Sequence, residues 1–105
     1  MALTHKLILA PSESTRKMLI RRMTFGRPAE EAQVVRSHSW GAVLLVQGSV
    51  PEIFYAADVG SKVSQVLAME VVGNCPQNII SMAFVGNVAD VKQVLAAFRS
   101  EGVVV

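Results

Sequence analysis

Hydrophobic and polar positions repeat one arrangement three times along the chain. In residues 6–23, 41–65 and 79–98, a short apolar run is followed by a polar break and then by apolar positions at helical spacing. An apolar run of this length bounded by turn-forming residues is typical of a strand. The pattern therefore predicts three units, each made of a strand, a cap and a helix.

Each polar break contains a residue that can cap a helix, followed by an acidic residue in the first helical turn. A hydroxyl or amide oxygen at the cap accepts from a free backbone N–H, and a carboxylate nearby interacts favourably with the helix dipole. In the second unit the spacing of serine and glutamate fits a capping box. The three pairs are Ser12 with Glu13, Ser49 with Glu52, and Asn87 with Asp90.

Two of the predicted helices have a face of apolar or small residues that can pack on a sheet. We expect these faces to cover one side of the sheet, so the remaining apolar surface predicts contacts between subunits. The face is Ile53, Ala57, Gly60 and Ser64 in the second unit, and Val88, Val91, Leu95 and Phe98 in the third.

A fourth apolar run, residues 66–72, predicts the strand that completes the sheet. The expected fold is α/β, an α+β sandwich of one domain over residues 1–105, with helices packed on a four-stranded sheet. Residues 24–40 form a longer and more polar connection, in which "AEEAQVVR" is compatible with a short helix or an edge strand.

Composition limits the classes of function. No apolar run approaches the roughly 18 residues of a membrane span, and the start of the chain does not resemble a signal peptide, so we expect a cytoplasmic protein. The net charge of +2 is small for a nucleic-acid-binding protein, so the basic cluster is interpreted as a solvated helix face. That cluster comprises Arg16, Lys17, Arg21, Arg22 and Arg27.

The single cysteine, Cys75, stands in the sequence "GNCPQ" between two apolar runs. Gly73, Asn74 and Pro76 are turn formers, which predicts that the thiol lies at the exposed tip of a hairpin-like connection. One cysteine cannot form an internal disulfide, in agreement with a reducing compartment. By itself it is a reactive or an inert surface thiol, because one thiolate is too few for a metal or cluster site.

Residues 55–98 contain a set of motifs in a fixed order. They are Ala56, Ala57, Asp58 and Lys62, then the loop 73–78, then Gly86, Asn87, Val88, Val91 and Lys92. This order resembles the shell domain of bacterial microcompartments. In common members a strand and its proline-containing end follow at the C-terminus, whereas here the similar "HKLILAPSEST" stands near the N-terminus. The resemblance therefore implies a circularly permuted domain, and it covers nearly the whole chain except residues 24–38.

The resemblance implies flat homohexamers that tile with other shell proteins into the wall of an organelle. Lys62 matches the lysine at the edge between hexamers, but the arginine that usually follows the outer-strand proline is replaced here by Ser12 after Pro11. The loop matches the central pore. Its predicted pore residues besides the cysteine are Gly73, Asn74, Pro76, Gln77 and Asn78.

The pore sequence "GNCPQ" also resembles that of divergent shell proteins from glycyl-radical propanediol-type microcompartments, in which the pore cysteine is associated with an iron–sulfur cluster. This implies a cluster, expected to be 4Fe–4S, bound by Cys75 and shared at the hexamer pore. A six-fold ring brings six copies of Cys75 to one axis, whereas a cubane cluster needs four thiolates. The function expected is structural and not enzymatic, with passage of metabolites or electrons through the pore.

Other classes of protein remain open from the sequence. A small ferredoxin-like sensor or a trimeric regulatory protein also contains strand–helix repeats. A thiol enzyme using Cys75 needs a base nearby, and His5 and His38 are remote from it in sequence. A Cys–Pro pair is also able to ligate haem. We expect neither nucleic-acid nor membrane partners.

Overall fold

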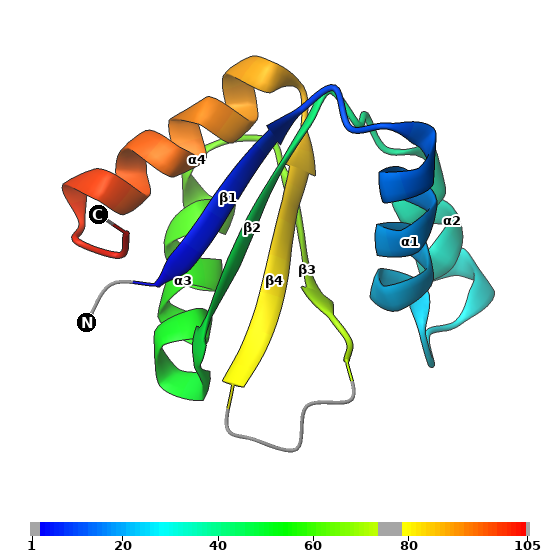
Figure 1. The fold of residues 1–105 in the computed structure, drawn as a ribbon, viewed down its shortest axis with the longest axis horizontal. Helices are drawn as coiled ribbons and strands as arrows, with labels where there is room; N and C mark the ends of the chain where they lie inside the picture. The colour runs from blue at the N-terminus through cyan, green and yellow to red at the C-terminus, as the bar shows by residue number, and fades with distance from the viewer. Residues whose placement is uncertain (1–2, 74–78, 105) are drawn as a thin grey trace.

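The computed structural model describes residues 3–73 and 79–104 of the chain. Within these residues, four antiparallel strands form one sheet in the order β1-β2-β4-β3 (Figure 1). The elements along the chain are β1 (Thr4–Leu9), α1 (Glu13–Thr24), α2 (Ala29–Ser37), β2 (Ala42–Ser49), α3 (Val50–Val63), β3 (Leu67–Val71), β4 (Ile79–Gly86) and α4 (Val88–Ser100). The predicted α/β fold and each of its strand–helix units are confirmed.

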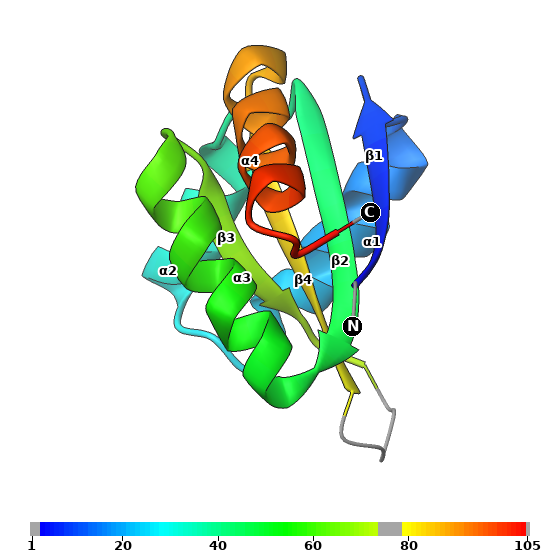
Figure 2. The same cartoon turned by 90° about the vertical axis from the view of Figure 1, so that its left-hand side faces the viewer.

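The sheet is covered by helices on both faces. Helices α3 and α4 lie on one side of it, and α1 and α2 lie on the other (Figures 1 and 2). Alternate side chains of the central strand β4 pack on opposite faces of the sheet, because successive side chains of a strand point to opposite faces. Met82 and Phe84 enter the core under α3 and α4, whereas Ala83 and Val85 enter the core under α1 and α2.

The expectation that helices cover only one face of the sheet is therefore wrong. The second face is buried by Leu19 and Met23 of α1 and by Val35 of α2. The apolar face of α1 was not predicted, and the region of α2 was compatible with either a short helix or an edge strand. That region is a helix, and the following segment is tied to it where the indole nitrogen of Trp40 donates to the Val35 carbonyl at 3.1 Å.

Two of the three predicted caps have the expected geometry. The Ser12 hydroxyl accepts from the Thr15 N–H at 3.2 Å, and the Asn87 side chain accepts from the Asp90 N–H at 2.8 Å. These contacts satisfy backbone donors at the starts of α1 and α4 that have no partner inside the helix.

The capping box predicted for α3 is only partly correct. Ser49 is the N-cap residue, but its side chain accepts no backbone N–H. Its hydroxyl donates to the carboxylate of Glu52 at 2.7 Å instead. Pro51 occupies the first turn and has no N–H to offer, and the two predicted partners interact through their side chains.

The buried helix faces are rotated slightly from those predicted. In α3, Ile53 and Gly60 are buried as expected, but Ala56 is more deeply buried than Ala57. In α4, Val88 is 38% exposed because it begins the helix. The residue that extends the buried stripe is Val94, together with the predicted Val91, Leu95 and Phe98.

The substitution Gly60→Ala tests the closest packing between α3 and the sheet. A Cβ at this position would lie 2.6 Å from a ring carbon of Phe84. Overpacking of this kind costs about 1–3 kcal/mol, whereas alanine gains about 1 kcal/mol over glycine as a helix former. We therefore expect the free energy of unfolding in urea to fall by about 1 kcal/mol. Ser61→Ala, on the exposed side of the same helix, is the control and should change it by less than about 0.5 kcal/mol. An equally stable or more stable Gly60→Ala protein would contradict the packing.

The chain's single tyrosine provides a test of how α3 meets the C-terminal segment. The Tyr55 hydroxyl donates to the Glu101 carboxylate at 2.9 Å. This hydrogen bond, and then the negative charge of Glu101, raise the pKa of Tyr55 above its ordinary value of 10.0. The contact therefore stabilises the fold fully below that value and is lost as the pH rises through the raised pKa.

In an absorbance titration of phenolate, we expect the wild-type midpoint to lie above the ordinary tyrosine pKa of about 10. Glu101→Gln should lower the midpoint, because it removes the charge. Glu13→Gln on the exposed start of α1 is the control and should leave it unchanged. The same midpoint for wild type and Glu101→Gln would show that the contact is not formed.

Candidate functional site

The candidate site lies at the end of the sheet where β3 and β4 form a hairpin. The two strands pair antiparallel, with Val71 opposite Ser81, which confirms the predicted pairing of the two apolar runs. Val72 precedes the predicted pore loop, Gly73 is its first residue and the last one described on this side, and Ile79 is the first described residue after it. The other predicted loop residues, Asn74, Cys75, Pro76, Gln77 and Asn78, lie outside the described residues.

The described end of β3 is fixed to the last turn of α1. The Val72 N–H donates to the Arg22 carbonyl at 3.3 Å, and the Arg22 guanidinium donates to the Val72 carbonyl at 3.2 Å. Both backbone groups of Val72 thus find partners on a helix that is remote in sequence. These two hydrogen bonds between Arg22 and Val72 fix the position at which the chain leaves the sheet toward the predicted pore loop.

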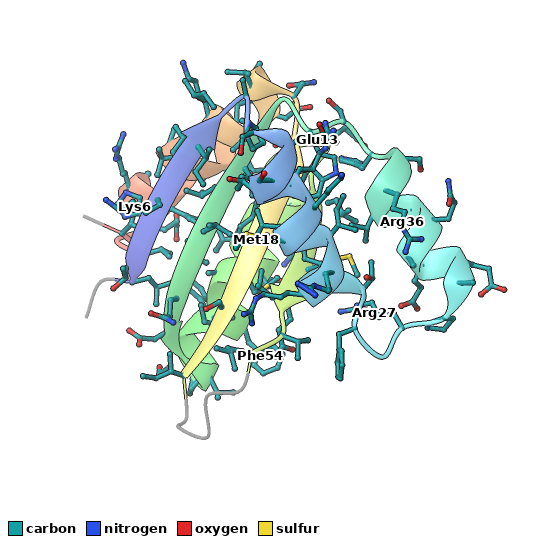
Figure 3. The ribbon with its side chains drawn as sticks, turned by 45° about the vertical axis from the view of Figure 1, so that its right-hand side comes forward. Lys6, Glu13, Met18, Arg27, Arg36 and Phe54 are labelled. Atoms are coloured by element: carbon teal, nitrogen blue, oxygen red, sulfur yellow. The ribbon has the colours of Figure 1, made fainter. Side chains whose placement is uncertain are left out.

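The basic residues that the sequence analysis grouped as one solvated face have different environments. Lys17 pairs with Glu13 at 3.1 Å, and Arg27 in the α1–α2 connection pairs with Glu31 at 3.2 Å. Figure 3 labels Glu13 at the start of α1 and Arg27 after its end. Arg21 and Arg22, by contrast, have no carboxylate within 4 Å among the described residues. Neither arginine has an acidic residue four positions away in the sequence. The spacing of charges along the chain therefore predicts which basic residues are paired and which are not.

Phe25 is a further residue of this region that the sequence analysis missed. It follows α1 directly as the C-cap residue and is 72% exposed. Phe25 lines the same surface as Arg21 and Arg22, which have no acidic partner among the described residues. The end of α1 is therefore an apolar and positively charged surface next to the end of β3.

Lys62, predicted to lie at a hexamer edge, is on the exposed side of α3. Its ammonium group pairs with the Asp58 carboxylate at 2.8 Å, one helical turn away, and its side chain is 73% exposed. A pair this exposed contributes little to the stability of a single subunit. Its role at an edge stays a prediction.

No three His, Cys, Asp or Glu side chains lie close enough to share a metal ion within residues 3–73 and 79–104. Cys75 is not among these residues, so the predicted cluster site stays a prediction. Over the same part of the chain, every helix is too short or too polar to cross a bilayer.

Comparison with known proteins gives matches only among solved structures. No protein-family model matches the sequence, and no curated protein is similar enough to match it. The ligand-free structure of the GrpU microcompartment shell protein from Pectobacterium wasabiae superposes with a TM-score of 0.66 and is 29% identical. The match covers 91% of this chain and 99% of that protein. The chain has the fold of a microcompartment shell protein.

A second structure supports the same assignment of the shell fold. The ligand-free GrpU shell protein from Clostridiales bacterium 1_7_47FAA also superposes with a TM-score of 0.66, at 23% identity. That match covers 94% of this chain and 90% of the other. Because both proteins are matched over nearly their full length, the shell fold includes the α1–α2 region as well as the motifs in residues 55–98. The predicted resemblance to the shell-domain family is thereby confirmed at the level of the domain.

Proposed function

We propose that this chain is a structural shell protein of a bacterial microcompartment, in which it forms a cyclic homohexamer with the loops 73–78 around a central pore. The observation that carries the proposal is the likeness to the Pectobacterium wasabiae shell protein, at 29% identity over 99% of that protein. A likeness over the whole chain, rather than over one motif, favours a structural and non-enzymatic role in the shell.

The proposal includes the circular permutation inferred from the order of motifs. The Leu3 N–H donates to the Val103 carbonyl at 2.8 Å, so the beginning and the end of the described chain are in contact (Figure 2). When two ends of a domain are adjacent, a strand can be supplied from either end with little change in packing. The strand in question, β1, lies at the edge of the sheet and pairs only with β2 among the described strands.

Because helices cover both faces of the sheet, the contacts of the proposed hexamer would come from the outer surfaces of the helices and from the edges of the subunit. Large apolar side chains are exposed on helices α1 to α4 and at the start of β4. Met18 on α1 and Phe54 on α3 lie on opposite sides of the sheet (Figure 3), and both are exposed. Such side chains are available for contacts between subunits.

The ring would bring six copies of the pore loop to one axis. One chain supplies one thiolate, from Cys75, so an iron–sulfur cluster fits only where several subunits combine their thiolates. The tie between Arg22 and Val72 supports this arrangement, since it fixes one root of each loop against α1. When bound, the cluster would supply one-electron transfer, and the protein would supply Cys75 as its ligand.

The proposal predicts a coloured hexamer when the protein is made with sufficient iron and sulfide and purified without oxygen. Native mass spectrometry should give the mass of six chains, with iron and sulfide at well under one cluster per chain. Cys75→Ser should remove the colour and leave the hexamer intact, because serine oxygen is a poor ligand for soft iron–sulfur centres.

The hexameric assembly and the shared cluster site can be contradicted by different results. A monomer or trimer at micromolar concentration would contradict the hexameric shell assembly. A Cys75→Ser protein that keeps its iron and sulfide, or a wild type that binds one cluster per chain, would contradict the shared pore site while leaving the shell fold untouched.

Lys62→Ala tests the proposed contact between hexamers. It removes the side-chain stem as well as the charge, so we expect hexamers that form fewer or smaller sheets in electron micrographs. Lys17→Ala is a matched control, because Lys17 is also an exposed lysine paired with an acidic residue one turn away. Sheets unchanged by Lys62→Ala, or reduced equally by Lys17→Ala, would remove Lys62 from the proposed edge.

A further inference from the structure

A hollow of about 190 Å³ lies between the end of α1 and the end of β3. It is lined by Arg21, Arg22, Phe25, Val72 and Gly73. Neither the shell fold nor the proposed cluster requires a binding site at this place, and all of its lining residues are described within one subunit.

One of its two guanidinium groups is held in place. The hydrogen bond from Arg22 to the Val72 carbonyl orients the group but uses only part of its fork of N–H donors. Gly73 lies beside this guanidinium, since a Cβ placed on it would be 3.6 Å from a terminal nitrogen of Arg22. A guanidinium that is already oriented loses less side-chain entropy when it binds a ligand.

The positive charge of the hollow has no acidic counterpart. Arg21 and Arg22 have no carboxylate within 4 Å among the described residues, whereas Lys17, Arg27 and Lys62 are each paired with one. Only the partial negative charge at the end of α1 offsets the two arginines. The hollow therefore favours an anion.

Phe25 and Val72 make the rest of the lining apolar, which favours an anion with an apolar body over a purely polar one. Phe25 presents an exposed ring, and Val72 adds an aliphatic side chain next to it. A guanidinium fork matches the geometry of a carboxylate, and an aromatic ring favours an apolar or aromatic body. We propose that this hollow binds a small organic carboxylate, with the carboxylate on Arg21 and Arg22 and the apolar body on Phe25.

Saturation-transfer difference NMR with benzoate and its neutral analogue benzamide tests the proposal on the assembled wild-type protein. Benzoate should receive clearly more saturation than benzamide, because only benzoate carries the charge that the arginines recognise. Arg21→Ala and Phe25→Ala should each weaken benzoate binding by about three- to tenfold, as expected for one exposed charge-assisted or aromatic contact. Lys17→Ala, on the same helix, is the control and should leave benzoate binding unchanged.

Arg22 requires a conservative variant because it also supports the end of β3. Arg22→Lys keeps the charge and a donor for the Val72 carbonyl but loses the planar fork, so it should weaken benzoate binding while the thermal midpoint stays near that of the wild type. Equal saturation of benzoate and benzamide, or wild-type benzoate binding by Arg21→Ala, would overturn the site. Displacement of benzoate by an equal concentration of inorganic phosphate would overturn its preference for an organic carboxylate. None of these outcomes depends on the hexamer or on the cluster.

Discussion

The burial of β2 and β4 on both faces is the constraint on which the rest of the structure depends. The ring of Phe84 in β4 meets Phe98 of α4 edge to face, with ring centres 5.3 Å apart, and lies against Gly60 of α3. On the other face, Ala83 and Val85 of the same strand contact the core under α1 and α2. With the middle of both central strands buried, β1 and β3 form the two edges of the sheet among the described strands.

This arrangement connects α1 to the candidate site. Because β3 is an edge strand, its end is not held by a neighbouring strand on both sides, and Arg22 supplies the missing contacts with both backbone groups of Val72. The same residue lines the proposed carboxylate site. A helix that covers the sheet thus also positions the root of the loop and places positive charge beside it.

Local patterns were enough to predict the strands, the helices α1, α3 and α4, and the caps at Ser12 and Asn87, because caps and periodicity depend on residues a few positions apart. The covering of both faces was missed, although the continuous apolar run "AVLLV" in β2 is typical of a strand buried on both sides. The contact between Arg22 and Val72 spans fifty positions, and no local signal encodes it. The sequence motifs alone led to a resemblance to the shell-domain family, and the likeness in structure confirmed the shell fold.

Cryo-electron microscopy of the protein purified without oxygen would test the central claim most directly, that the end of the β3–β4 hairpin is the functional centre of a shell assembly. We predict a six-fold ring in which residues 73–79 surround the axis, the last turn of α1 lies beside them, and extra density on the axis contacts Cys75. A ring with these residues on its outer rim, or an assembly without six-fold symmetry, would contradict the account.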